Sequence, residues 1–188
     1  IPEYQALTGS REELADTVIA AAWRSDGTMA GFCSTVIIHV PGVGDVQHLG
    51  LTCVRPEERS NGLTHILTHK AVAGYLFRHK PVIGKLWVSN CAAVLSSLVN
   101  VSLHFQQVYP SPFTDVRLTE NHRKIAEAID RYYRHKIYIH SDATFDGDAF
   151  VFRGSVKGTM FQKSAGETRY YHRNSDLNEF YKDRMVFE

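Results

Sequence analysis

The sequence contains little cysteine and no apolar run long enough to cross a membrane. Its three cysteines, Cys33, Cys53 and Cys91, are odd in number and lie in apolar surroundings. This pattern indicates reduced, buried thiols rather than a disulfide framework, so we expect a cytoplasmic protein. No stretch approaches the roughly 20 apolar residues of a transmembrane helix. We therefore expect no membrane partner.

An excess of charge of one sign is missing as well. The chain has 21 Lys and Arg against 20 Asp and Glu, spread without long runs. Composition gives no basis for bulk attraction to a phosphate backbone, so we expect no nucleic-acid partner. Metal-ligand spacing is also lacking. His65 and His69 lie one helical turn apart, but no third ligand is fixed by spacing, and we expect no metal.

The length and the N-terminus bound the domain organisation. A chain of 188 residues is most economically one domain, and we predict a single domain over 1–188. No signal peptide is visible. The first residue is Ile1 rather than Met, which leaves open that the native N-terminus is missing.

The first half of the chain has the pattern of an α/β fold. Residues 10–23 fit either one continuous helical face or a short helix followed by a strand, and we favour the second. The predicted elements are a helix over 11–17 opened by a capping box at Ser10–Glu13, a strand through Trp23, a turn at Asp26-Gly27, a hairpin of strands 32–40 and 46–54, a helix from Asn61 to Lys80, a strand over 82–88, and a short helix capped by Ser89-Asn90.

The predicted helix from Asn61 has an apolar face, and the second half of the chain is less regular. The apolar face comprises Leu63, Ile66, Leu67, Ala71, Gly74 and Phe77. Beyond it, the pattern predicts a strand over 105–109, a helix over 119–135 and a hairpin of strands 137–145 and 148–156 around Asp146-Gly147, and it leaves 165–188 unassigned.

The most specific stretch joins a predicted strand to a predicted helix at residues 54–64. Its sequence is VRPEERSNGLT, with Pro56, Arg59 and Gly62 at fixed spacing. A strand that enters a helix through a tight turn leaves backbone amides pointing outward, and the helix dipole favours an anion there. Glycine lets an anion approach the backbone closely. The stretch therefore predicts a phosphate-binding turn.

The pattern Val-x-Pro-x-x-Arg-x-x-Gly-Leu resembles motif A of the GCN5-related N-acetyltransferase (GNAT) family, whose core is Arg/Gln-x-x-Gly-x-Gly/Ala. Here Thr64 stands where the family has Gly or Ala. The resemblance covers 17–110 and leaves a helix, a hairpin and a tail in 111–188. It implies a GNAT-like fold, α/β (α+β) with a mixed, largely antiparallel central sheet flanked by helices. It also implies acetyl-CoA as cofactor, its pyrophosphate held by Arg59, Ser60, Asn61, Gly62, Leu63 and Thr64.

Other residues of this chain also match functional positions of the family. His48 stands where histone acetyltransferases of the family carry a glutamate base, and the resemblance implies that it deprotonates the amine. Ser97 occupies the place of the family's tyrosine acid. Serine is a poor acid, so Tyr109 or water would have to protonate the thiolate. The pantetheine arm would be held by Asn90 and by backbone groups of Thr52, Cys53 and Val54.

The resemblance implies an acyltransferase, an N-acetyltransferase that acts on an amine by direct transfer in a ternary complex. The acceptor would be a small-molecule amine or a peptide, and a homodimer stays open. Two alternatives remain. One is a non-catalytic or regulatory acyl-CoA-binding domain of the same fold, favoured by the missing tyrosine. The other is a generic α/β domain that binds a different phosphorylated ligand at the 59–64 turn.

Overall fold

The computed structural model describes residues 9–59, 61–79, 85–113, 116–164 and 166–184. The chain divides into two compact units, Ile1–Ser89 and Asn90–Glu188. Each unit has a hydrophobic core cluster of its own, centred on Cys33, Leu67 and Ala71 in the first unit and on Leu95, Val99 and Tyr181 in the second. The prediction of one domain over 1–188 stays a prediction.

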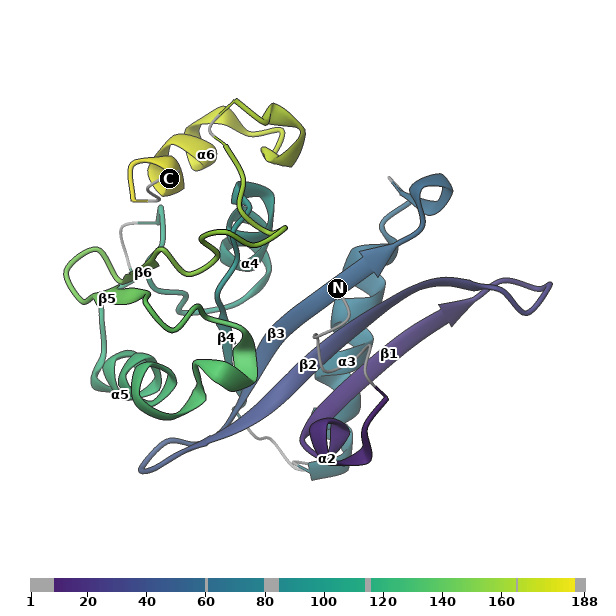
Figure 1. The fold of residues 1–188 in the computed structure, drawn as a ribbon, viewed down its shortest axis with the longest axis horizontal. Coiled ribbons are helices and arrows are strands. Elements are labelled where there is room, and N and C mark those ends of the chain that lie inside the picture. The colour runs from purple at the N-terminus through teal and green to yellow at the C-terminus, as the bar shows by residue number, and fades with distance from the viewer. Residues whose placement is uncertain (1–8, 60, 80–84, 114–115, 165, 185–188) are drawn as a thin grey trace. The chain divides into compact units, whose positions relative to one another are not determined.

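The first unit is built on a four-stranded sheet with the order β1-β2-β3-β4 (Figure 1). The strands are β1 (Thr17–Trp23), β2 (Met29–Val40), β3 (Gly44–Val54) and β4 (Trp87–Asn90). β1 pairs antiparallel with β2, and β2 antiparallel with β3. Together with the helices, this confirms the predicted mixed α/β (α+β) fold with a largely antiparallel sheet.

A short helix precedes β1, as the favoured interpretation predicts. α2 (Arg11–Leu14) ends early, and β1 then pairs with β2 along its whole length. The predicted capping box is wrong, because Ser10 is the N-cap residue but its side chain makes no cap hydrogen bond. The turn at Asp26-Gly27 is confirmed by Gly27 at φ +83° and by the amide of Arg24, which donates to the carbonyl of Thr28.

Helix α3 (Leu63–His79) packs along the sheet and buries only part of the predicted apolar face (Figure 1). Leu67, Ala71 and Tyr75 are buried, whereas Ile66 is 53% and Phe77 81% exposed. The cause lies at Tyr75, whose hydroxyl donates to Asp45 of β3 at 2.7 Å while its ring is buried. A phenol with a polar partner fills the core position that the sequence pattern assigned to purely apolar residues.

A buried glutamine joins α3 to the sheet. Gln47 of β3 is fully buried, and its amide donates to the hydroxyl of Thr35 at 2.7 Å and to the carbonyl of Ala71 at 3.2 Å. Its Oε1 has no partner among the described residues. Gln47 therefore faces α3. Because side chains alternate along a strand, His48 lies on the opposite face of the sheet.

β3 contains a β-bulge between these residues and the 54–64 turn. Cys33 pairs with Thr52 and Thr35 pairs with Leu49, so Gly50 and Leu51 stand opposite Ser34 alone. The hydroxyl of Ser34 donates to the carbonyl of Leu51 at 3.3 Å. A bulge bends a strand and redirects the side chains on either side of it.

The second unit is mainly helical. α5 begins at an N-cap, Thr119, which accepts from the amide of His122, and it continues as a π-helical turn. This confirms the helix predicted over 119–135, although Tyr132 is 72% exposed rather than on a buried face. The elements are α4 (Leu95–His104), α5 (Glu120–Ala128), the π-helical turn (Ile129–Tyr133), β5 (Thr144–Asp146), β6 (Val151–Arg153) and α6 (Ser175–Lys182).

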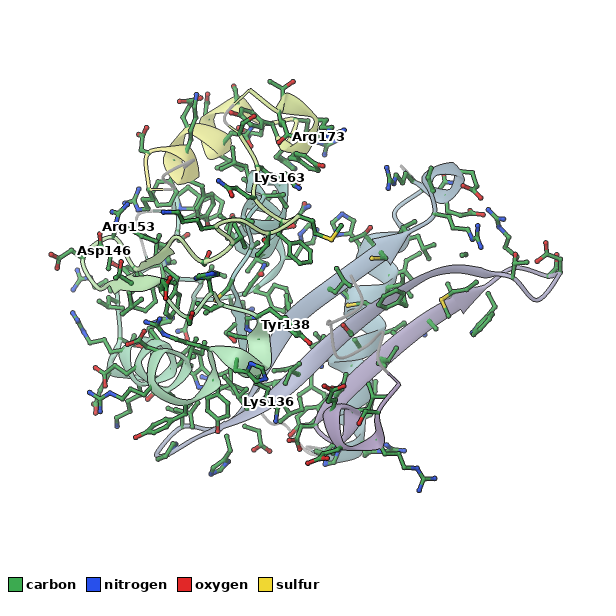
Figure 2. The ribbon with its side chains drawn as sticks, viewed as in Figure 1. Lys136, Tyr138, Asp146, Arg153, Lys163 and Arg173 are labelled. Carbon is green, nitrogen blue, oxygen red and sulfur yellow. The ribbon has the colours of Figure 1, made fainter. Side chains whose placement is uncertain are left out.

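Two other predictions for this unit have different outcomes. The strand predicted over 105–109 is wrong, because these residues follow the end of α4 and lead into a cis peptide bond at Tyr109-Pro110. The predicted hairpin is confirmed with shorter strands, β5 and β6. Figure 2 shows Asp146 beside Arg153, which donates to it at 2.6 Å, and Asp146 also accepts from two loop amides. These contacts account for the carboxylate as a turn residue.

Candidate functional site

The candidate site is centred on the turn between β3 and α3. The amide of Arg55 donates to the carbonyl of Ala30, which holds the end of β3 against β2. A 3-10 turn, Pro56–Glu58, follows. Arg59 is exposed and its amide donates to the carbonyl of Pro56. The segment thus projects from the sheet and returns to it at α3, as the strand-turn-helix pattern predicts.

Arg24 holds the two acidic residues of this turn. Its guanidinium donates to Glu58 at 2.7 Å and to Glu57 at 2.9 Å. These hydrogen bonds, the one with Glu58 first, raise the pKa of Arg24. A backbone hydrogen bond and then the bond from Arg24 lower the pKa of Glu57. Since both carboxylates are paired, their charge opposes an anion at the neighbouring turn less than free carboxylates would.

Gly62 forms the first step of α3. Its φ of +73° is strained for any residue with a Cβ, and its carbonyl accepts the amide of Ile66 as the first bond of the helix. The amides of Leu63 and Thr64 follow in the first turn, where a helix gives them no partner of its own. A Cβ on Gly62 would meet nothing within 4 Å, so the space beside this turn is open.

These features make the turn suitable for a phosphate. Backbone donors, the positive end of a helix of 17 residues and an open approach are found together. Asn61 and Thr64 are exposed at the same place. Ser60 lies outside the described residues.

The predicted pantetheine-binding residues form the end of β3. Cys53 pairs with Phe32, and Val54 pairs with Gly31. A side chain at Gly31 would come within 2.8 Å of the carbonyl of Cys53, so glycine permits this close approach of the two strands. Thr52, Cys53 and Val54 therefore follow directly on the bulge and lead into the phosphate-binding turn.

His48 is joined to the neighbouring strand by one hydrogen bond. It pairs with Val36 in β2, and its Nδ1 lies 3.0 Å from the hydroxyl of Ser89 in β4. Only 3% of its surface is exposed. Burial lowers the pKa of His48 to about 4. The ring is therefore neutral at pH 7 and has a free lone pair, but it is a weak proton acceptor.

The other predicted catalytic and binding residues belong to the second unit. Asn90 is the last residue of β4 and does not cap a helix, because α4 begins at Leu95 after Val94 as N-cap. That part of the prediction is wrong, because residues 91–94 are not helical, and the hydroxyl of Ser89 lies beside His48 instead. Ser97 lies half-buried in the first turn of α4.

Tyr109, the alternative acid, packs against aromatic rings. Its ring centroid lies 5.0 Å from that of Phe150 and 5.8 Å from that of His122. Tyr109 thus belongs to a group of packed aromatic rings within the second unit.

The cysteines differ in exposure. Cys33 is buried and Cys53 half-buried, and burial raises the pKa of both thiols, which suits packing rather than nucleophilic attack. Cys91 is exposed as a residue, so the prediction of burial fails there, although the surroundings of its thiol are dry enough to raise the pKa of Cys91 to about 12. Cys91 follows the end of β4 in a segment without regular structure.

Within the described residues, no three His, Cys, Asp or Glu side chains are grouped so that they could hold a metal ion. None of the helices within them combines the length and the apolar character that crossing a bilayer requires.

Sequence reasoning missed three features of the site: the bulge at Gly50-Leu51, the hydrogen bond between His48 and Ser89, and the pairing of Arg24 with Glu57 and Glu58. Gly50 inside a strand was a usable signal for the bulge. The two contacts join residues more than 30 positions apart and left no local signal.

No protein-family model matches the chain, and no curated protein matches it. A similar solved structure is the crystal structure of an apo aminoglycoside antibiotic 6'-N-acetyltransferase from Acinetobacter haemolyticus. The two are 20% identical with a TM-score of 0.38, over 61% of this chain and 81% of that chain. At this TM-score the likeness assigns neither a family nor a function to this chain.

Proposed function

We propose that this protein is an acetyl-CoA-dependent acyltransferase, an N-acetyltransferase that acts on an amine by direct transfer. The observation that carries the proposal is the turn between β3 and α3. There the motif-A residues Arg59 and Gly62 stand between a bulged strand and the N-terminus of a long helix. This is the local arrangement that the sequence resemblance implies for a coenzyme A pyrophosphate.

The chain's own residues supply the binding groups. The amides of Leu63 and Thr64 would donate to the pyrophosphate, with Arg59 adding positive charge from the exposed turn. The pantetheine arm would extend along Thr52–Val54, and the sequence resemblance assigns Asn90 to the same arm. The acetyl thioester would then lie near the bulge, where amides of β3 could stabilise the oxyanion.

The chemical step needs a neutral amine. Its nitrogen attacks the thioester carbonyl, a C–N bond forms, the C–S bond breaks, and the thiolate leaves and takes up a proton. Because His48 is buried, we propose that it accepts the amine's proton through a water relay rather than by direct contact. Water would protonate the thiolate, a role for which the sequence resemblance offers Ser97 in place of the family's tyrosine.

One observation favours a second function, a non-catalytic acyl-CoA-binding domain. His48 has a pKa of about 4, which is far from the near-neutral value that suits a general base. With serine in place of the family's tyrosine, both proton-transfer positions are weak. For the first function, the transferase, the acceptor would be a small-molecule amine or a peptide.

Calorimetric titration of acetyl-CoA into the wild type, Gly62→Trp and Gly158→Trp tests the cofactor site. Gly158 is a matched control, because it has a φ of +70° and a Cβ there also meets nothing within 4 Å. Both variants therefore carry the same backbone strain and a new indole in open space. We expect micromolar binding to the wild type and to Gly158→Trp, and at least about a hundredfold weaker binding to Gly62→Trp.

The same proteins then separate the candidate functions. Thiol release with a panel of amines and peptides supports the transferase, and binding without release supports the non-catalytic domain. Failure of the folded wild type to bind acetyl-CoA rejects both. Competition by another phosphorylated compound would then indicate the generic α/β domain.

A further inference from the structure

We propose that Ser89 is a positioning residue that sets the tautomer of His48. In this assignment the hydroxyl oxygen of Ser89 accepts the Nδ1–H of His48, and the lone pair of the ring stands on Nε2. The role given to that lone pair rests on the proposed function, in which His48 accepts the amine's proton.

Both side chains come from regular strands and not from loops. His48 lies in β3 and Ser89 in β4, two neighbouring strands of one sheet. The distance from Nδ1 to the hydroxyl oxygen is 3.0 Å, within the range of a good hydrogen bond. The ring is 3% exposed, so its packing limits rotation away from this partner.

A neutral imidazole has one donor and one acceptor nitrogen. Ser89 occupies Nδ1, so Nε2 is the nitrogen left for exchange with a water or an amine. Nε2 can accept a proton only when Nδ1 carries the hydrogen. A serine hydroxyl can donate to Nδ1 or accept from it, and the accepting arrangement, which we assign here, holds the ring in the form that a base requires.

The chain contains a second buried histidine with the opposite tautomer, which serves as an internal reference. Nε2 of His122 lies 2.9 Å from the carbonyl of Gln107, and a carbonyl can only accept, so Nε2 carries the hydrogen. Its Nδ1 accepts from the backbone amide of Thr119 at 3.1 Å. The two rings should thus give opposite patterns of protonated and unprotonated nitrogen in one spectrum.

The test is a two-dimensional ¹H–¹⁵N spectrum of the full chain, labelled with ¹⁵N-histidine, at pH 7 without acetyl-CoA. His48→Gln and His122→Gln assign the two rings by loss of signal. We expect His48 protonated at Nδ1 and His122 protonated at Nε2. Ser89→Ala should shift His48 toward a mixture of tautomers, and Ser89→Thr, which keeps the hydroxyl, should restore the wild-type pattern.

Kinetics give a second readout in the same variants. Ser89→Ala should lower kcat by at least about tenfold with little change in KM for acetyl-CoA, and Ser89→Thr should recover most of that loss. Protonation of His48 at Nε2 in the wild type would overturn the proposal. So would a tautomer that Ser89→Ala leaves unchanged in a protein whose circular dichroism shows it folded.

The two proposals fail in different ways. The tautomer is measured in protein without acetyl-CoA, so absence of cofactor binding rejects the acyltransferase and leaves the spectrum to decide the position of the hydrogen. The wrong tautomer together with normal thiol release rejects only the role of Ser89.

Discussion

The ionisation of His48 differs between the folded and the unfolded chain. Its pKa is about 4 in the fold because burial disfavours the charged ring, and it returns to about 6.5 on unfolding. Between these two values the unfolded chain binds more protons than the folded one. The contribution of neutral His48 to stability is therefore complete above about pH 6.5 and is lost as the pH falls toward 4.

We predict that His48→Gln removes this pH dependence. From pH 7 to pH 4.5 the wild type should lose about 2 kcal/mol more unfolding free energy than the variant does, because glutamine takes up no proton. Urea unfolding of both proteins at several pH values measures the difference. Carboxylates titrate in both proteins and cancel in the comparison. Parallel stability curves would show that His48 is not held neutral by burial.

At the scale of the elements, the orientation of α3 decides which of its side chains pack in the core and which are exposed to solvent. Leu67 is 3% exposed and packs against Cys33 and Ala71, whereas its neighbour Ile66 is 53% exposed. Adjacent residues of similar size thus lie on opposite sides of the boundary between core and solvent.

We predict that Leu67→Ala costs about 2 to 4 kcal/mol of unfolding free energy, because it removes buried methyl groups and leaves a cavity. Ile66→Ala should cost less than about 1 kcal/mol. The midpoints of urea unfolding, compared at a common slope, measure both. Equal losses would instead support the wider apolar face that the sequence pattern predicts.

Local patterns were enough to predict much of the fold and of the turn. The hairpin of β2 and β3, the start of α3 after Gly62 and the helix at Glu120 follow from β-branched runs, turn residues and helical spacing. Features set by tertiary contacts were not predictable in this way. Tyr75 replaces apolar residues in the core because Asp45 satisfies its hydroxyl, and Ser89 contacts His48 of the neighbouring strand instead of capping a helix.

At the scale of the whole molecule, the chain has two compact units and a convenient set of probes. Both tryptophans, Trp23 and Trp87, belong to the first unit. Val99 is fully buried in the core cluster of the second unit. Tryptophan fluorescence therefore reports on one unit while a substitution perturbs the other.

We propose from the sequence that residues 1–188 form one domain, and the two units then unfold together. Val99→Ala should remove about 2 kcal/mol, and the midpoint seen by tryptophan fluorescence should fall with that seen by far-ultraviolet circular dichroism. A fluorescence midpoint that stays at the wild-type value while the dichroism midpoint falls would show two independent folding units.

The bulge in β3 also bears on how this strand can change in length. Removing one residue from a regular strand sends every side chain beyond it to the other face of the sheet. Here removal of Gly50 would bring Leu49 and Thr52 to alternate positions of an unbroken ladder, so Thr52 and Val54 would keep the face they have now. A one-residue deletion at this point, unlike most substitutions, would alter the backbone beside His48 and leave the packing of α3 in place.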